Sequence, residues 1–121
     1  MRIALVDDCP NDLSIMHQFL AETLDTDSVI TEFHNGEDFL QHWSADTFDL
    51  IVLDIYMEQL TGIEIARVIR ETDPNVCLVF ATTSNEFASE SYEVNACYYL
   101  CKPFLKQQVL AMLDRIGQQN L

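Results

Sequence analysis

The stretch LIVLDIYMEQLTG, residues 50–62, constrains the fold more than any other part of the chain. It opens with an unbroken apolar run, Leu50 to Leu53, which is typical of a strand buried on both faces of a parallel sheet. Asp54 ends this run, and a carboxylate where a core strand emerges must be solvated, paired or bound to a cation. The Thr61-x-x-Glu64 pattern then predicts a capped helix. We therefore expect strand, carboxylate, loop and helix in that order, with Asp54 at the rim of the sheet.

Other apolar segments alternate with helical patterns along the rest of the chain. The expected strands are Arg2–Val6, Val29–Phe33, Leu50–Asp54, Val76–Ala81 and Tyr98–Cys101, and the expected helices run from Pro10 to about Leu24, around Phe39–Trp43, from about Thr61 to Thr72, around Phe87–Val94 and over Leu105–Ile116. The pattern around Phe87–Val94 is the weakest, and the more polar Val29–Phe33 is expected near a sheet edge. Strands that alternate with helices predict an α/β fold, a parallel sheet with right-handed crossovers and helices on both faces.

Size, charge and cysteine usage narrow the class of protein. A chain of 121 residues fits one domain with a real core, and no apolar run approaches the length of about 20 residues that spans a membrane. The start of the chain is too short for a signal peptide, so a cytoplasmic protein without membrane contact is expected. The net charge of −14, from 20 acidic and 6 basic residues, disfavours nucleic-acid binding by this chain and favours divalent cations and basic partners. The four cysteines and three histidines lack zinc spacing, so free thiols are expected.

Polar side chains stand where the expected strands end. Because parallel strands point the same way, these side chains should meet at one edge of the sheet: Asp7, Asp8, Asp54, Thr82 and Lys102. Crowded carboxylates repel one another, and a lysine together with Mg²⁺ would offset their charge. One carboxylate is then available as a nucleophile for a phosphoryl group. Asp54 on the central strand is the expected acceptor, and Asp7 and Asp8 are the expected metal holders.

Each of these residues also has a structural explanation when taken alone. Asp7 or Asp8 could cap the following helix, and Asp54 could simply end a strand. Thr82 could be an ordinary strand residue, and Lys102 a solvated surface lysine. The convergence of all of them on one edge favours the functional interpretation.

Four motifs in order along the chain resemble the response-regulator receiver domain of two-component signalling. They are VDD at 6–8, IVLDIYM at 51–57 with Gly62, FATT at 80–83 and YYLCKPF at 98–104. The resemblance covers essentially the whole chain. The stretch SNEFASESYEVNACYYLCKPF, residues 84–104, further resembles receivers that are attached to LytTR-type (LytR/AlgR-like) DNA-binding domains.

This resemblance implies a flavodoxin-like (βα)5 fold with strand order 2-1-3-4-5. It implies that Asp54 accepts a phosphoryl group from the histidine of a sensor histidine kinase. Asp8 and Asp54 would bind Mg²⁺ directly with the backbone carbonyl of Tyr56, and Asp7 would assist through water. Thr82 and Lys102 would each bond a phosphoryl oxygen. Such a domain catalyses only its own phosphorylation and dephosphorylation and is not an ordinary enzyme.

The resemblance also implies a switch and an output. Tyr99 would turn inward when Thr82 moves, although burial habits alone favour ordinary core packing for a tyrosine. The face made by the fourth helix, the fifth strand and the fifth helix would then change, with a homodimer through that face as one consequence. The Lys102–Pro103 bond is expected to be cis. Residues 1–121 would be a single receiver domain, the N-terminal part of a longer regulator that controls transcription through a separate DNA-binding domain.

The sequence departs from the family pattern near the site. Glu58 stands where the family usually has proline, and Thr83 where it more often has alanine. Tyr56 and Ser84 occupy positions at which the family tunes dephosphorylation, so the lifetime of the phosphate is left open.

Three other functions are alternatives to a phosphorylation switch. A haloacid-dehalogenase-like phosphohydrolase also uses a strand-end aspartate, but its second acid would fall at Tyr56. A flavodoxin-like electron carrier needs a Ser, Thr or Gly-rich first loop for the phosphate of FMN, whereas residues 7–12 are acidic. A pseudo-receiver that signals without phosphate is disfavoured by the complete acidic set.

Overall fold

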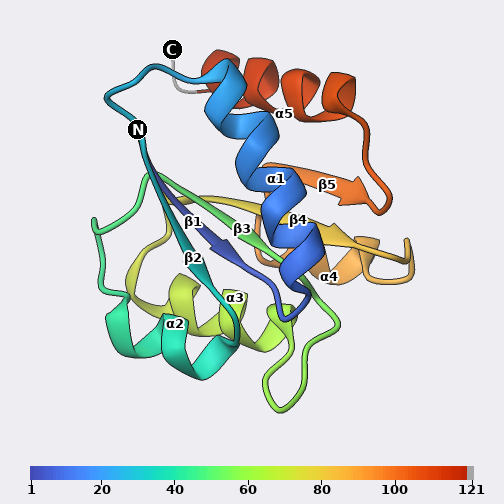
Figure 1. Ribbon diagram of the computed structural model, residues 1–121. Helices are drawn as coiled ribbons and strands as arrows, with labels where there is room; N and C mark the ends of the chain where they lie inside the picture. The colour runs from blue at the N-terminus through green and yellow to red at the C-terminus, as the bar shows by residue number, and fades with distance from the viewer. Residues whose placement is uncertain (120–121) are drawn as a thin grey trace.

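The computed structural model describes residues 1–119 of the chain and the side chains of residues 1–117. Strands and helices alternate along it (Figure 1). Their bounds are β1 Arg2–Val6, α1 Pro10–Thr23, β2 Val29–Phe33, α2 Gly36–His42, β3 Leu50–Leu53, α3 Gly62–Thr72, β4 Cys77–Thr82, α4 Ala88–Glu93, β5 Tyr98–Cys101 and α5 Lys106–Gln119. Each expected strand and helix is present, and the largest shifts, of three residues, are at the start of α2 and the end of α5.

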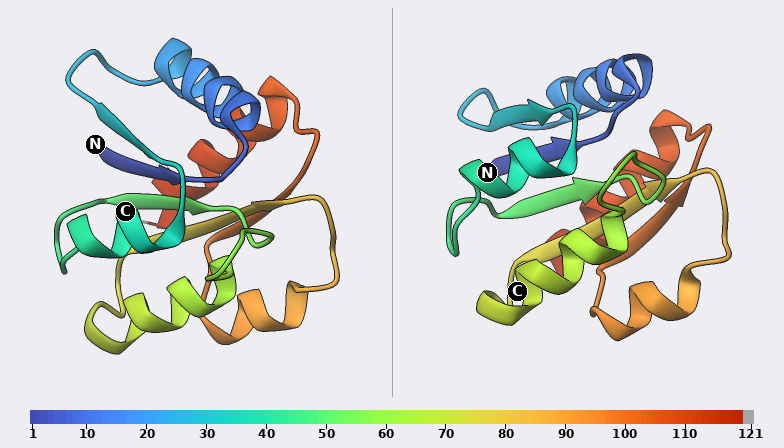
Figure 2. Two further views of the ribbon diagram at one scale, coloured as in Figure 1. Left: turned by 60° about the horizontal axis from the view of Figure 1, so that its bottom comes forward. Right: turned by 90° about the horizontal axis from the view of Figure 1, so that it is seen from below.

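The strands form one parallel five-stranded sheet in the order β2-β1-β3-β4-β5. This order is the one that the receiver resemblance implied. The central strands β3 and β4 are buried at every residue, which explains their continuous apolar sequences. The more polar β2 lies at an edge, as predicted. Figure 2 shows the strand arrows pointing toward one edge, where the loops after β1, β3 and β4 lie together.

Helices cover both faces of the sheet. Helices α1 and α5 lie on one face, and α2, α3 and α4 lie on the other (Figures 1 and 2). Each interface is an apolar cluster that takes alternate residues of the same strands. In β1, for example, Ala4 and Val6 face one cluster, while Ile3 and Leu5 face the other. Because alternate residues must enter the apolar cluster on each face, the two clusters together fix the register of the central strands.

Helix α3 begins close against the end of β3. Thr61 and Glu64 form the predicted capping box, with the Glu64 N–H donating to Thr61 Oγ1 over 3.2 Å. The next residue, Gly62, donates its N–H to the carbonyl of Ile55 at 3.0 Å. A Cβ at Gly62 would lie 2.2 Å from the carbonyl oxygen of Asp54, so only glycine fits this approach. The start of α3 thus braces the backbone that carries Asp54.

One detail of the expected packing is wrong. Leu105 was expected as the first apolar residue of the last helix, but it precedes α5 and is 62% exposed. Phe104 takes the buried place instead, after the turn at the Lys102–Pro103 bond, which is cis. The four cysteines are free thiols. Over the part of the chain that the structure describes, no helix is both long enough and apolar enough to cross a membrane.

Candidate functional site

Three carboxylates meet at the carboxyl edge of the sheet, as the sequence predicted. Asp7 and Asp8 follow β1 and Asp54 follows β3, and one oxygen from each lies within 4.8 Å of the others. Asp7 and Asp54 are buried, whereas Asp8 is exposed. The backbone holds the two loops together, because the Asp54 N–H donates to the carbonyl of Val6 at 2.9 Å. The pairing of β1 with β3 therefore places these acids side by side.

Lys102, directly after β5, reaches across the sheet edge into this cluster. Its ammonium Nζ lies 2.7 Å from Asp7, 2.9 Å from Asp12 and 3.5 Å from Asp54, each measured to Oδ2. Only 8% of the lysine side chain is exposed. Burial alone lowers the pKa of Lys102, but hydrogen bonds to Asp7 and Asp12 and the charge of Asp54 raise it above its ordinary value. The lysine is a buried cation, not a solvated surface residue.

Asp54 carries the largest electrostatic perturbation among these acids. Burial is the main cause that raises the pKa of Asp54 to about 7, and the charge of Asp7 is the second. The charge of Lys102 lowers this pKa, but by less. The ammonium of Lys102 alone therefore does not balance the negative charge of the carboxylates. The chemistry of this donor set, oxygen atoms from several acids with one exposed, fits a small hard cation such as Mg²⁺.

Thr82, the last residue of β4, presents an unpaired hydroxyl. Its side chain is fully buried, and its Oγ1 finds no hydrogen-bond partner among the described residues. A buried hydroxyl without a partner costs free energy, about 1–3 kcal/mol for a group of this kind. An oxygen-rich ligand at the strand ends would satisfy it. The structure therefore brings Thr82 to the edge that also holds Asp54 and Lys102, as the sequence analysis expected.

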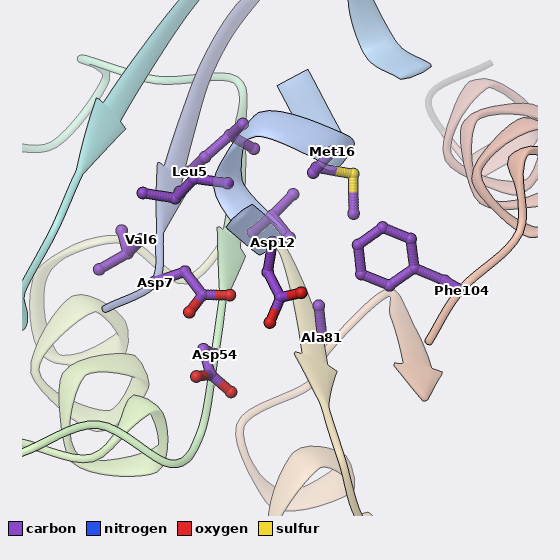
Figure 3. A pocket seen from close by; sticks show the side chains of 10 residues that line it. Leu5, Val6, Asp7, Asp12, Met16, Asp54, Ala81 and Phe104 are labelled. Carbon is purple, nitrogen blue, oxygen red and sulfur yellow. The ribbon is translucent and has the colours of Figure 1, made fainter. Parts of the chain in front are cut away.

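Asp12 is a member of the cluster that the sequence analysis missed. It lies in the first turn of α1, and its carboxylate turns toward those of Asp7 and Asp54 (Figure 3). Burial raises its pKa, but the hydrogen bond from Lys102 and the lysine's charge outweigh this and lower it overall. Its spacing four residues after Asp8 was the available signal, because one helical turn brings such a residue back toward the preceding loop.

The β4–α4 loop is tied to its neighbours at successive residues. The Tyr99 hydroxyl donates to the carbonyl of Ser84, and the Cys101 thiol to Asn85 Oδ1 at 2.6 Å. From the other side the Tyr56 hydroxyl donates to the carboxylate of Glu86. The ring of Tyr56 also packs edge-on against Phe87, with centroids 5.4 Å apart. Glu86 was not predicted, since only the folded loop brings it to Tyr56.

The departures from the family pattern lie on the open side of the site. Glu58 lines a surface groove with Asp8, His34 and Glu37, and both Glu58 and Thr83 are exposed. Tyr56 is 43% exposed at the rim. Glu58 therefore adds an acidic side chain, and Tyr56 an aromatic one, to the surface around the strand-end residues.

The doubly wound α/β fold, with clustered acids, a threonine and a buried lysine at its strand ends, is the arrangement that the receiver resemblance implied. Residues 3–114 match the model of the response regulator receiver domain. The chain belongs to this family, the receiver domains of two-component response regulators. Its relatives include the sensory transduction protein LytR of Staphylococcus epidermidis, 34% identical over 119 residues. That match covers 96% of this chain but 46% of the relative, so the chain spans about half of that protein's length.

Solved structures agree with this assignment. The BeF3-activated receiver domain of DrrB, a Thermotoga maritima response regulator, superposes on this chain with a TM-score of 0.83 at 31% identity. The match covers 97% of each of the two chains. TrrA from the same organism, solved in complex with Mg²⁺ and BeF, gives a TM-score of 0.80 at 27% identity, covering 95% of this chain and 97% of that one. The fold and family are thus shown independently of the site geometry.

Proposed function

We propose that this chain is the phosphoacceptor switch of a two-component system and that Asp54 receives a phosphoryl group from the phosphohistidine of a sensor histidine kinase. A carboxylate oxygen of Asp54 attacks the phosphorus, the P–N bond to the histidine breaks, and its electron pair stays on the imidazole nitrogen, which is protonated. The observation that carries this proposal is the convergence of Asp54, Lys102 and the unpaired hydroxyl of Thr82 on one edge of the sheet.

Lys102 and Thr82 supply the groups that a phosphoryl group needs. The ammonium of Lys102 lies 3.5 Å from Asp54 Oδ2, within reach of an oxygen added there. The hydroxyl of Thr82 is free to donate to a second phosphoryl oxygen. Both act by position and charge, which is the main contribution of a protein to phosphoryl transfer.

The acids of the cluster would take different roles in binding Mg²⁺. Both oxygens of Asp7 are engaged, Oδ1 by the N–H of Cys9 at 2.9 Å and Oδ2 by Lys102 at 2.7 Å. Asp8 and Asp54 are then the direct ligands that we propose, with the carbonyl of Tyr56, while Asp7 acts through water. The bound ion would neutralise charge on the transferring phosphoryl group. The complex of TrrA with Mg²⁺ and BeF supports this proposal by similarity.

The output that we propose passes through the β4–α4 loop. When Thr82 moves toward the phosphoryl group, Ser84 moves with it, and the Tyr99 hydroxyl loses or changes its partner. The face formed by α4, β5 and α5 then changes and can bind a second copy or an output domain. Because the chain covers 46% of its LytR relative, we propose that residues 1–121 are the N-terminal receiver of a longer cytoplasmic regulator whose separate domain binds DNA and controls transcription.

Phos-tag electrophoresis with acetyl phosphate tests the proposal. Wild type with Mg²⁺ should show a shifted band that is absent without Mg²⁺, and Asp54→Asn should show none under either condition. Thr82→Ala, which leaves the acids intact, should still be labelled but more slowly, because one stabilising contact to the phosphoryl group is lost.

Three outcomes would contradict the assignment. Labelling of Asp54→Asn at the wild-type rate would place the acceptor elsewhere. Steady release of phosphate from a phosphomonoester by wild type would favour a phosphohydrolase instead. An unlabelled wild type under conditions in which a known receiver is labelled would remove the phosphoacceptor role altogether.

A further inference from the structure

Asp12 and Lys102 form an ion pair that the proposed phosphoryl chemistry does not require. Their closest atoms lie 2.9 Å apart, and the lysine makes its other short contact, 2.7 Å, with Asp7. An ammonium has three N–H donors. Two of them thus face acids other than the phosphoacceptor, and Asp54 lies farther away, at 3.5 Å.

Phosphorylation changes the charge balance around this lysine. When every acid is ionised, Asp7, Asp8, Asp12 and Asp54 against Lys102 give four negative charges and one positive charge. A phosphoryl group on Asp54 replaces one carboxylate charge by a group carrying about two negative charges. Asp12 then repels the incoming group and competes with it for the same ammonium.

The two short partners of Lys102 are not equivalent. Asp7 is held on both oxygens, and its side chain is 10% exposed. Asp12 belongs to the first turn of α1, and its side chain is 29% exposed. A carboxylate with access to water, at a helix N-terminus that favours negative charge, is released from an ion pair at lower cost than a buried one. Asp12 is therefore the partner that Lys102 can leave.

We propose that Asp12 is a positioning residue for Lys102, which holds the ammonium toward α1 in the unphosphorylated protein and releases it to the phosphoryl oxygen when Asp54 is modified. This inference rests on the proposed function of Asp54 and adds a residue that sets how readily that function operates. Asp12 slows phosphoryl arrival, and its negative charge also strengthens cation binding.

Substitution of Asp12 separates this role from a structural one. At saturating Mg²⁺, Asp12→Asn should be labelled by acetyl phosphate about fivefold faster than wild type, because one repelling charge near the phosphoryl group is gone. It should also bind BeF3⁻ more tightly and Mg²⁺ more weakly, as titration calorimetry would show. Asp12→Glu keeps the charge and should stay close to wild type. The gain in rate should shrink as NaCl is raised.

Asp27→Asn is the matched control, because it removes an equal charge from an exposed residue between α1 and β2, at the opposite edge of the sheet. Its labelling rate should equal that of wild type. If Asp12→Asn is labelled no faster than Asp27→Asn, while circular dichroism shows both folded, the proposal for Asp12 is wrong and the function of Asp54 stands. If wild type itself is not labelled at Asp54, the proposed function of Asp54 is wrong, and the proposal for Asp12, which rests on it, is wrong as well.

Discussion

Asp54 is the acid of the site whose ionisation the fold alters most. Its ordinary pKa of 3.8 becomes about 7 in the folded protein, through burial first and the neighbouring Asp7 second. The folded state therefore binds a proton at Asp54 that the unfolded state has lost between these two pH values. The resulting contribution to stability is present below pH 3.8 and disappears as the pH rises to about 7.

Asp54→Asn should consequently stabilise the metal-free protein at pH 8 by about 2 kcal/mol more than at pH 5. The amide cannot ionise, so the cost of a buried charge beside Asp7 disappears. Urea denaturation in EDTA at both pH values, for wild type and variant, measures this difference. Asp27→Asn, which changes an exposed acid, should show no such difference. An equal effect of Asp54→Asn at both pH values would mean that Asp54 ionises in the folded protein as it does in the unfolded chain.

Among single residues, the sequence predicted those members of the site that stand at strand ends. Parallel strands bring their ends to one edge whatever the loops do, so Asp7, Asp54 and Lys102 could be placed together before the structure was known. Asp12 and Glu86 could not be placed in this way. The contact of Asp12 depends on the rotation of α1, and that of Glu86 depends on the path of an irregular loop.

Among the elements, α3 is fixed most tightly to the site, through Gly62. A methyl group at this position would lie 2.2 Å from the backbone oxygen of Asp54, and a backbone atom cannot move aside as a flexible side chain can. Gly62→Ala should therefore destabilise the protein by about 2–4 kcal/mol, in the range of other strained core substitutions, and should slow labelling of Asp54. Urea denaturation and Phos-tag electrophoresis on the same samples measure both effects.

Gly117→Ala provides the control for this substitution, because a Cβ there would meet no atom within 4 Å among the described residues, its own helix backbone and chain neighbours aside. Alanine in place of a helical glycine should stabilise α5 by about 0.5–1 kcal/mol and leave labelling unchanged. Equal stability of Gly62→Ala and wild type would show that the loop after β3 can shift without cost, and that α3 does not brace Asp54.

The elements were predicted with uneven success, for physical reasons. Buried parallel strands such as β3 and β4 appear in the sequence as apolar runs, and the α3 capping box specifies where that helix starts. Helix α4 spans six residues, ASESYE, of which only Ser91 is buried, so its sequence carries little periodic signal. Leu105 fitted the period of α5 but precedes the helix and is exposed, whereas its neighbour Phe104 is buried.

For the molecule as a whole, the net charge of −14 and the acidic site predict two separable effects of salt. NaCl screens the general repulsion and should raise the melting temperature of every variant to a similar extent. MgCl2 at equal ionic strength should raise it further in wild type, because an ion present at ten times its Kd adds about 1.4 kcal/mol of stability, or about 5–6 °C for a domain of this size. The additional rise should disappear in Asp8→Asn, which removes the exposed acid of the cluster, and persist in Asp27→Asn.

Differential scanning fluorimetry in matched salts measures both effects. If Asp8→Asn and Asp27→Asn respond alike to MgCl2, the ion acts only on the overall charge, and the cluster of Asp7, Asp8 and Asp54 is not a magnesium site.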